Sequence, residues 1–382
     1  MKKGIIIGAG IGGLTTAIAL AKKNFDVTVY EQADKLREVG AGIWVAPNGL
    51  KVFEKLGIVQ DIIKAGNMLE KIGVVDLKGN PISIVNGDKI RAKHGYSTLA
   101  LHRADLQKIL VSHVPKEKIV LGTKFKSYRQ TQDSIIAEFE DGSTAEADFI
   151  VNAAGLKSNV RERIQPDSVL RYSGQTCWRF VANLDLPKED EDKMFEIWGN
   201  KKGLRAAYSK INQRQVYCYI TDCRPAGETD NIQTLKMDLL NLCMEFPAII
   251  KDLLIACDEK AIIRTDLFDF KPIRKWIDGR LVLIGDAAHA TTPNLSQGAC
   301  QAIEDAYVLA EELSRTDDIG KAFENFQSKR IEKATAVTNL SWQYAKMTNT
   351  SGLTRFLIKT AIRLTPESVS EKQLDKIYSL DY

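Results

Sequence analysis

Hydrophobic and polar positions at the start of the chain follow the pattern of a strand, a helix and a second strand. Residues 3–7 form a short apolar run, residues 14–23 carry small and apolar side chains, and residues 26–31 (DVTVYE) alternate with a period of two. A period of two indicates a strand with one buried face, and a longer run of helix-forming residues indicates a helix. The first 31 residues therefore predict a strand–turn–helix–strand unit.

The same patterns divide the rest of the chain into a mixed part and a β-rich part. Helices are predicted over residues 48–65, 103–113, 231–258 and 298–314. Strands are predicted over residues 119–121, 134–139, 148–152, 177–186, 203–211, 215–223 and at the start of 281–288. We therefore predict an α/β fold. A discontinuous Rossmann-like domain spans 1–170 and 269–345, a β-rich substrate domain is inserted at 171–268, and a C-terminal helical tail covers 346–382. A cleft between two such domains is a favoured ligand site.

Composition and charge narrow the class of protein. The chain has 382 residues, of which 44% are hydrophobic and 27% charged, as is typical of a globular protein. No run approaches the ~20 apolar residues of a membrane span, and glycines interrupt the N-terminal MKKGIIIGAG, which argues against a signal peptide. The net charge of +4 comes without a basic run. We expect a cytoplasmic protein with no nucleic-acid partner and no membrane association.

Metal-ligating residues are sparse. The six cysteines form no CxxC pair, and the chain has four scattered histidines. A structural zinc site needs clustered ligands. We therefore predict free, mostly buried thiols and no metal site.

A glycine-rich turn, GAGIGG at 8–13, lies between the first strand and the first helix. In such a turn Gly8 permits the tight bend, Gly10 lets the backbone approach a pyrophosphate, and Gly13 lets the helix pack closely on the strand. The helix N-terminus offers free N–H groups to phosphates, and Glu31 at the end of the second strand can accept hydrogen bonds from a ribose. This half-site suits FAD and NAD(P) equally. The residues predicted to bind the dinucleotide here are Gly8, Gly10, Ile11, Gly12, Gly13 and Glu31.

A second motif, GDAAHATTPNLSQGACQAIEDA at 285–306, follows an apolar strand. Asp286 and His289 lie three positions apart. By themselves they are compatible with a metal site, an acid–base couple or a group that holds a ligand.

Taken with LHRADLQKIL at 101–110, these two motifs make the chain resemble the single-component FAD-dependent aromatic hydroxylases. That family includes salicylate-, hydroxybenzoate- and urate-hydroxylating enzymes and the tetracycline-inactivating monooxygenases. The resemblance extends to about residue 345. It implies that the Rossmann-like domain binds FAD.

The resemblance also implies roles for individual residues. Asp286 would bind the ribityl chain of FAD, and Pro293 would lie beside the flavin ring. Gly298 and Ala299 would offer backbone N–H groups to the pyrimidine edge of the flavin, where a helix N-terminus stabilises negative charge. Arg103 would reach the phosphate and ribityl region. His289 would be a structural or flavin-edge residue and not a base.

One motif departs from the family. NAAGLKSNVR at 152–161 matches at Gly155, Ser158 and Arg161, but Ala154 stands where the family usually has an acid that serves FAD and NAD(P)H. The lost hydrogen bond is worth up to about 3 kcal/mol when charged. The sequence therefore leaves the choice between NADH and NADPH open.

By this resemblance the protein is an NAD(P)H-consuming monooxygenase that hydroxylates a small aromatic or heteroaromatic compound. It would use FAD and dioxygen through a peroxyflavin intermediate, as a monomer or homodimer. A flavin oxidase or reductase without oxygen insertion shares residues 8–31 and the Gly-Asp pair at 285–286, so it remains the alternative. A plain NAD-dependent dehydrogenase or a non-enzymatic binding module would leave 285–306 unexplained.

Two residues of the β-rich part are candidates for catalysis. GNKKGLRAAYS at 199–209 resembles the strand whose arginine faces the substrate in urate-hydroxylating members, which places Arg205 at that arginine and Tyr217 at a tyrosine of the same pocket. The period of two puts Tyr217 and Tyr219 on one face of their strand and Cys218 on the other. The alternative is that the tyrosines are core residues and Arg205 is solvated.

Residues 353–364 (LTRFLIKTAIRL) form an amphipathic pattern, with apolar residues opposite three basic ones. A membrane-surface helix has this pattern, as does a helix that packs its apolar face on protein. We expect the second, with the apolar face on the FAD domain or across a dimer.

Overall fold

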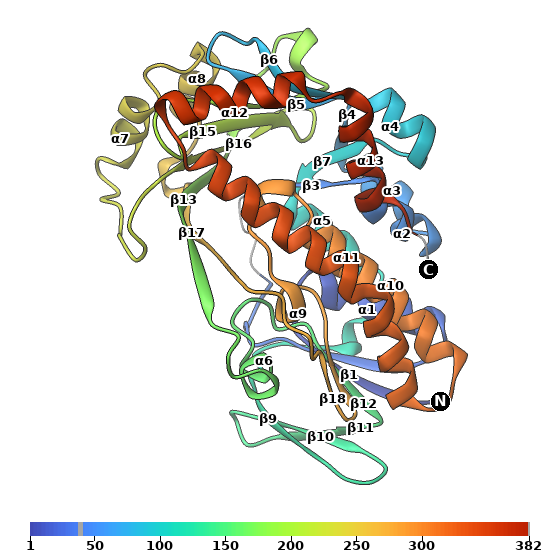
Figure 1. Cartoon of the computed structure of the whole chain (residues 1–382). Coiled ribbons are helices and arrows are strands. Elements are labelled where there is room, and N and C mark those ends of the chain that lie inside the picture. The colour runs from blue at the N-terminus through green and yellow to red at the C-terminus, as the bar shows by residue number, and fades with distance from the viewer. Residues whose placement is uncertain (37–40, 381–382) are drawn as a thin grey trace.

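The N-terminal unit forms the centre of a six-stranded sheet in the computed structural model, which describes residues 1–36 and 41–380 (Figure 1). The strand order is β18-β19-β12-β1-β2-β8. All neighbours pair in parallel except β18 and β19, which are antiparallel. The strands are β1 (Lys3–Ile7), β2 (Asp26–Tyr30), β8 (Ile119–Val120), β12 (Phe149–Asn152), β18 (Ile277–Asp278) and β19 (Leu281–Leu283).

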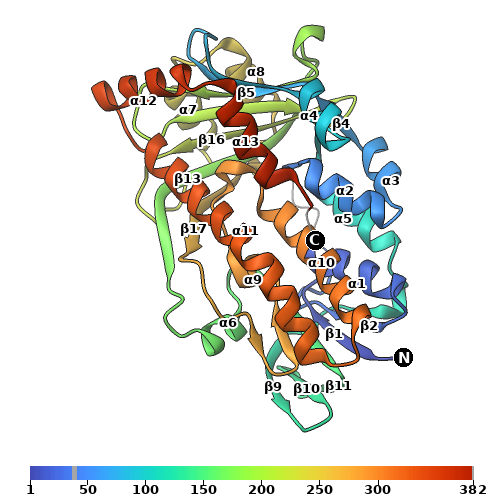
Figure 2. The same cartoon turned by 45° about the vertical axis from the view of Figure 1, so that its right-hand side comes forward.

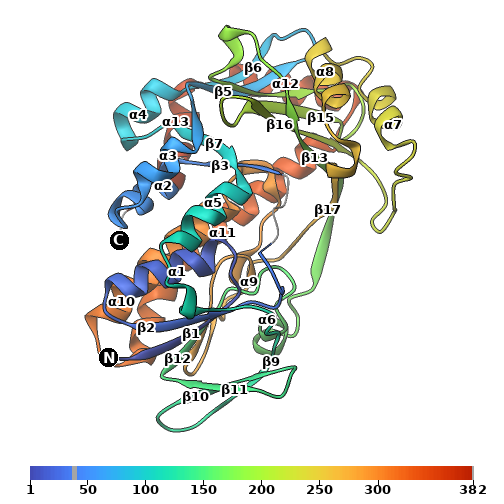
Figure 3. The same ribbon diagram turned by 180° about the vertical axis from the view of Figure 1, so that it is seen from behind.

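Helices and a small sheet cover this central sheet. Helix α1 (Ile11–Lys22) packs against α10 (Gly298–Arg315) and α5 (Arg103–Ser112), as Figure 3 shows from behind. A three-stranded sheet, in the order β11-β10-β9, contacts β1 and β12 and belongs to the same hydrophobic core. Its strands are β9 (Phe125–Gln130), β10 (Ile135–Phe139) and β11 (Thr144–Ala147). The expected mixed α/β architecture with a Rossmann-like centre is confirmed.

A seven-stranded sheet forms the other half of the molecule, in the order β17-β13-β16-β15-β14-β5-β6. One face packs on α7 (Leu235–Leu242) and α8 (Ala248–Ala256) and forms a second core. The strands are β5 (Lys71–Asp76), β6 (Pro81–Asn86), β13 (Leu170–Asn183), β14 (Lys193–Trp198), β15 (Arg205–Lys210), β16 (Gln215–Asp222) and β17 (Ile263–Phe270). The opposite face points toward the first half.

Two of these seven strands come from outside the predicted insert of 171–268. Strand β5 pairs in parallel with β14, and β6 follows as the edge strand. Their partner lies more than a hundred residues away in the chain, so no local pattern marks them as members of this sheet. A third sheet, in the order β3-β7-β4, lies before and after them in the sequence. Its strands are β3 (Gly42–Val45), β4 (Gly66–Leu69) and β7 (Thr98–His102).

Two helices predicted as continuous are each broken into two. The predicted 48–65 helix is α2 (Pro47–Lys55) and α3 (Val59–Lys64), separated at Gly57, whose φ of 71° ends a right-handed helix. The predicted 231–258 helix is α7 and α8, with Pro247 directly before α8. Proline removes a helical hydrogen bond and starts helices well, so it resets the chain there. The remaining short helices are α4 (Gly87–His94), α6 (Asn159–Ile164), α9 (Asp286–His289), η1 (Lys116–Lys118), η2 (Lys188–Asp190), η3 (Glu259–Ala261) and η4 (Pro293–Leu295).

Three helices end the chain. The long α11 (Ile319–Thr348) runs from the parallel sheet to the seven-stranded sheet, α12 (Gly352–Leu364) crosses beside β6, and α13 (Glu367–Tyr378) returns toward α4 (Figure 2). Among the described residues, no helix combines the length and the apolar character that crossing a membrane requires.

Of the two placements expected for the apolar face of α12, packing on the FAD domain is wrong, and packing across a dimer stays a prediction. Leu353, Phe356 and Leu357 are exposed, whereas Arg355 is buried. The reason is hydrogen bonding: the Arg355 guanidinium donates to the backbone oxygens of Gly199 and Thr348, which satisfies carbonyls at a strand end and a helix end. The basic side of α12 therefore faces the protein.

Candidate active site

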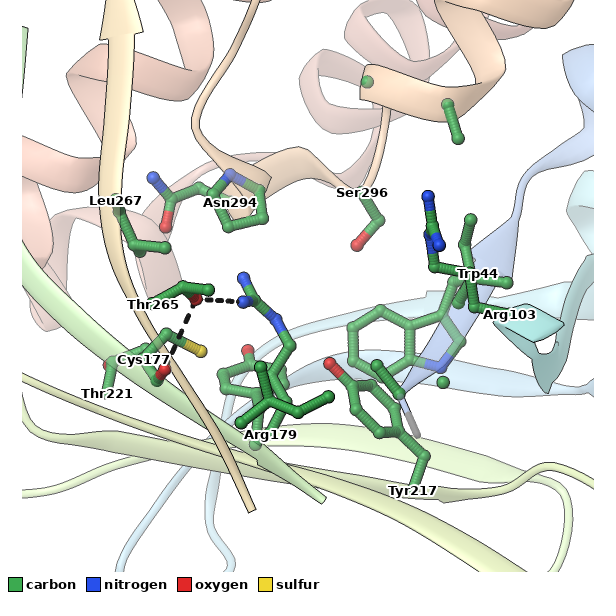
Figure 4. Close-up of a pocket in the computed structure, with 18 of the residues that line it drawn as sticks. Trp44, Arg103, Cys177, Arg179, Tyr217, Thr221, Thr265, Leu267, Asn294 and Ser296 are labelled. Carbon is green, nitrogen blue, oxygen red and sulfur yellow. Dashed lines mark hydrogen bonds between the residues drawn. The ribbon is translucent and has the colours of Figure 1, made fainter. Parts of the chain in front are cut away.

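A cavity of about 410 Å³ lies between the seven-stranded sheet and the segment from α9 to α10. Figure 4 shows side chains from both halves of the molecule pointing into it. Arg205 and Tyr217 share its wall with five residues predicted to bind the cofactor. Those five are Arg103, Asp286, Pro293, Gly298 and Ala299.

The glycine-rich turn lies outside this lining, at the carboxyl end of β1. Gly8 has a φ of 103°, a conformation that glycine adopts without strain. A Cβ on Gly13 would lie 2.0 Å from the backbone oxygen of Gly8, and one on Gly12 would lie 3.1 Å from the Cβ of Ala302. A Cβ on Gly10 would meet nothing within 4 Å. Gly12 and Gly13 are therefore needed for close helix packing, and Gly10 borders open space.

Glu31, directly after β2, stabilises this turn by hydrogen bonds. Its carboxylate accepts the Ala9 N–H at 2.8 Å and the Ala33 N–H at 3.0 Å. Each carboxylate oxygen has a further lone pair, so these bonds leave room for a ribose hydroxyl. The ribose contact itself stays a prediction.

Asp286 and Arg103 both line the cavity and interact electrostatically. Asp286 follows Gly285, whose φ of 57° turns the chain sharply between β19 and α9. The Asp286 side chain opens to the cavity, yet the protein around it displaces water and raises its pKa, which His289 and Arg103 oppose. A Cβ on Gly298 would lie 3.7 Å from the Asp286 carboxylate. The acid therefore lies beside the N-terminus of α10.

His289 is not among the residues that line the cavity. It stabilises the turn at Gly285 through a shared contact with Asp305. Its Nε2 lies 2.6 Å from Asp305 Oδ2, and the same oxygen accepts the Gly285 N–H at 2.9 Å. Arg330 Nε donates to the other oxygen of Asp305 at 2.7 Å. Burial alone would raise the pKa of Asp305, but His289 and Arg330 hold it well below its ordinary value. Of the two interpretations of His289, the contacts favour the structural one.

This cluster predicts a pH-dependent loss of stability. Because its pKa in the fold is lowered, ionised Asp305 stabilises the protein above its ordinary pKa of 3.8, and this stabilisation is lost as the pH falls below that value. Asp305→Asn should cost about 3 kcal/mol at neutral pH, because it leaves buried Arg330 with one partner fewer. Thermal unfolding of the unaltered protein and of Asp305→Asn should be measured from neutral to acid pH. The difference between their unfolding temperatures should shrink below the ordinary pKa of Asp305. A difference that is constant with pH would contradict this role.

Arg205 is deeply buried, with 1% of its surface exposed. Its Nη1 lies 2.9 Å from Glu196 Oε2, and its Nη2 donates to Gln175 Oε1 at 3.1 Å and to Asn294 Oδ1 at 3.0 Å. Burial opposes ionisation of Glu196, but Arg205 and three donated hydrogen bonds lower its pKa overall. The alternative of a solvated Arg205 is therefore wrong: the residue belongs to a buried ion pair at the cavity wall.

Tyr217 and Tyr219 face the cavity, whereas Cys218 packs in the core under α7 and α8. The alternation expected for β16 is thus observed. The Tyr217 ring packs edge-on against Trp44, with centroids 5.6 Å apart, and a Cβ on Gly42 would lie 2.2 Å from that tyrosine ring. Trp44 donates from Nε1 to Ser209 at 2.8 Å. Together these contacts form a rigid aromatic wall.

Several cavity residues carried no specific prediction. They are Trp44, Cys177, Arg179, Thr265 and Asn294. For Arg179 a usable signal existed, because alternation along β13 puts Cys177 and Arg179 on one face and Trp178 on the other. Alternation alone does not tell which of the two faces lines the cavity. That follows from the pairing of β13 with β16, in which Arg179 lies opposite Tyr219.

The departing motif at 152–161 forms a structural turn. Ser158 donates to Asn152 Oδ1 at 2.9 Å and caps α6. Arg161 is fully buried, and its guanidinium lies 4.4 Å from the centre of the Phe270 ring. Ala154 adds no polar side chain to this turn. The contacts assign Arg161 a packing role and leave the nicotinamide contact as a prediction.

The site fits FAD. Helices α1 and α10 both begin without a side-chain cap, so each offers free backbone N–H groups at its N-terminus. At α1 the space beside Gly10 is open. Such groups suit the pyrophosphate and the ring of an extended dinucleotide. Between them, Arg103 and Asp286 supply polar side chains on the cavity wall.

Comparisons with known proteins agree with this fit. The family described as "FAD binding domain" matches residues 2–341. Aurachin C monooxygenase/isomerase of Stigmatella aurantiaca is 36% identical over 337 residues, covering 87% of both chains. FAD-dependent urate hydroxylase of Klebsiella pneumoniae is 29% identical over 333 residues, covering 87% of this chain and 86% of the relative.

Solved structures give the same result. Klebsiella pneumoniae HpxO complexed with FAD and uric acid superimposes with a TM-score of 0.90 at 26% identity, covering 98% of this chain and 96% of that one. The chain therefore belongs to the family of FAD-dependent monooxygenases that share this FAD binding domain.

Proposed function

We propose that the protein is an NAD(P)H-consuming hydroxylase of a small aromatic or heteroaromatic compound, acting in the cytoplasm as a monomer or homodimer. The observation that carries this proposal is the single cavity that joins the predicted flavin-binding residues to an aromatic wall. Asp286, Pro293 and Gly298 line it from the segment from α9 to α10, and Trp44, Tyr217 and Tyr219 line it from β3 and β16. A planar compound bound against the aromatic wall would face the cofactor.

Each part of the cavity then has a role that the chain's own groups supply. When bound, FAD supplies the redox chemistry with NAD(P)H and dioxygen. Overall, one oxygen atom of dioxygen replaces a ring C–H with C–OH and the other leaves as water, with NAD(P)H and a proton consumed. Asp286 would hold the ribityl chain, and the N-terminus of α10 would stabilise negative charge on the reduced ring. Trp44 and Tyr217 would orient the substrate and exclude water.

Tyr217 is suited to donate a hydrogen bond rather than to act as a base. Burial raises its pKa well above the ordinary value, although Arg179 opposes the shift. Its hydroxyl therefore stays protonated near neutral pH. We propose that it orients a substrate oxygen, while the Arg205–Glu196 pair fixes Asn294 at the cavity wall.

Isotope-labelled dioxygen tests this function. The purified, FAD-loaded protein is screened with hydroxybenzoates, purines such as urate, and quinolones, and the oxidation of NADH and of NADPH is followed. We expect at least one compound to stimulate oxidation and to acquire one labelled oxygen atom. Because Ala154 stands where the family usually has an acid, the same assay also measures the rate of reduction and the preference between NADH and NADPH. Peroxide measured in parallel reports uncoupled turnover.

The same assay separates the alternative. A flavin oxidase or reductase would change the substrate without acquiring labelled oxygen. Stimulated turnover with no label in any product would contradict the proposed hydroxylase.

A further inference from the structure

Three arginines line the cavity, namely Arg103, Arg179 and Arg205. The charges of the two that lie on the seven-stranded sheet, Arg179 and Arg205, are compensated differently. We propose that Arg179, rather than Arg205, is the residue that selects the substrate, by pairing with an anionic oxygen on an aromatic acid. This inference rests on the proposed function, because it assigns a specificity residue to the same cavity. Its chemical content is that the preferred compound carries a carboxylate, or a ring oxygen ionised near neutral pH.

The charge of Arg205 is already compensated within the protein. Glu196 lies 2.9 Å from its Nη1, and both groups are buried. The carboxylate of Glu196 also accepts hydrogen bonds from Trp198 at 2.6 Å, from Tyr344 at 2.7 Å and from Tyr219. An anion entering the cavity would therefore meet a pair with no net charge. Arg205 Nε is a buried donor without a hydrogen-bond partner among the described residues. It could donate a hydrogen bond to an uncharged acceptor of a ligand.

Arg179 has no such partner. Its Nη1 donates to the Thr265 hydroxyl, and among the described residues its main electrostatic neighbours are Cys177, Tyr217 and Tyr219, of which Tyr217 is also a hydrogen-bond partner. Burial raises the pKa of each of these three groups, so all are neutral near pH 7. A guanidinium is charged at any accessible pH. Arg179 therefore brings an uncompensated positive charge to the cavity.

The acid on the cavity wall does not supply the missing charge. Among the described lining residues the carboxylate is that of Asp286, and its electrostatic neighbours are His289 and Arg103. A charge that is half-buried without a counter-ion is costly, and that cost is removed when an anion binds. An uncompensated cation in a cavity is therefore an arrangement that favours an anionic ligand.

The direction of the side chain agrees with this role. Figure 4 shows the Arg179 guanidinium extending into the cavity, with Thr265 and Cys177 on one side and Tyr217 and Trp44 on the other. The Thr265 hydroxyl in turn donates to the Cys177 carbonyl at 3.4 Å, which fixes one end of the fork. The remaining N–H groups can form the two parallel bonds that a carboxylate accepts. Trp44, Tyr217 and Leu267 would enclose the ring of such a compound.

Matched acids and amides test this inference without turnover. The FAD-loaded protein is titrated near neutral pH with benzoate and benzamide, naphthoate and naphthamide, and quinaldate and quinaldamide, and binding is followed by the change in flavin absorbance. We expect at least one acid to bind about tenfold or more tightly than its amide. Arg179→Gln should abolish this preference and change amide binding less than about threefold. Arg179→Lys should keep part of it, and exposed Arg214→Gln should change nothing.

The outcomes separate this inference from the proposed function. No acid preference in the unaltered protein, or a preference that survives in Arg179→Gln, would overturn the role of Arg179. So would a loss of FAD retention or an altered flavin spectrum in Arg179→Gln with the preference intact, because Arg179 would then serve the flavin. Failure to incorporate labelled oxygen would instead remove the hydroxylase proposal and leave the acid preference to be judged by the titrations.

Discussion

Replacing Gly13 with alanine is expected to yield a protein that no longer retains FAD and is less stable. The added Cβ would lie 2.0 Å from the backbone oxygen of Gly8, so α1 must move away from β1. Backbone cannot give way as a flexible side chain can, and the cost should be about 3 kcal/mol. Because the displaced helix N-terminus is also the expected phosphate site, FAD affinity should fall about 100-fold. Thermal unfolding of the apoprotein and flavin retention on gel filtration measure the two effects.

Gly10→Ala is the matched control for this prediction. Its Cβ would meet nothing within 4 Å, and its backbone φ of −74° suits any residue. The apoprotein should therefore be as stable as the unaltered one, while FAD affinity falls because the methyl group occupies space that the pyrophosphate needs. If Gly10→Ala bound FAD with unchanged affinity, the expected path of the pyrophosphate would be wrong.

Removing Glu196 is expected to have the second large effect. Glu196→Ala would leave Arg205 buried without its counter-ion and would deprive Trp198, Tyr219 and Tyr344 of their acceptor. Breaking a buried ion pair from one side costs about 3–5 kcal/mol. The free energy of unfolding of the FAD-loaded protein, from urea titration, should fall by this amount. Activity should fall too, because Arg205 also positions Asn294 at the cavity wall.

A surface pair provides the control for Glu196. Glu191 lies 2.6 Å from Lys210 and 42% of its side chain is exposed, so Glu191→Ala should cost less than about 1 kcal/mol. Replacing both members of the buried pair, as Glu196→Leu with Arg205→Met, should recover part of the lost stability because no unpaired charge remains. Equal losses for Glu196→Ala and Glu191→Ala would show that the buried pair does not stabilise the fold.

Local sequence patterns were sufficient for the cofactor half of the site. The strand, glycine turn, helix and acid of residues 3–31 are contiguous, so spacing alone predicts where the turn and the acid lie. The Gly-Asp turn at 285–286 likewise depends on neighbours in sequence. Patterns failed where the deciding contact was distant, as for β5, which joins the seven-stranded sheet through β14, and for α12, whose buried face is set by carbonyls at Gly199 and Thr348.

The sequence by itself determined the α/β class, the dinucleotide turn and the alternation that puts Tyr217 and Tyr219 on one face, because these depend on residues a few positions apart. Only the tertiary structure decided which arginine has a free charge. Arg205 and Arg179 both alternate into the cavity, but Glu196 from β14 compensates the first, whereas the main electrostatic neighbours of the second among the described residues are a cysteine and two tyrosines. The physical reason is that electrostatic compensation depends on distance in space, which strand pairing sets and sequence spacing does not.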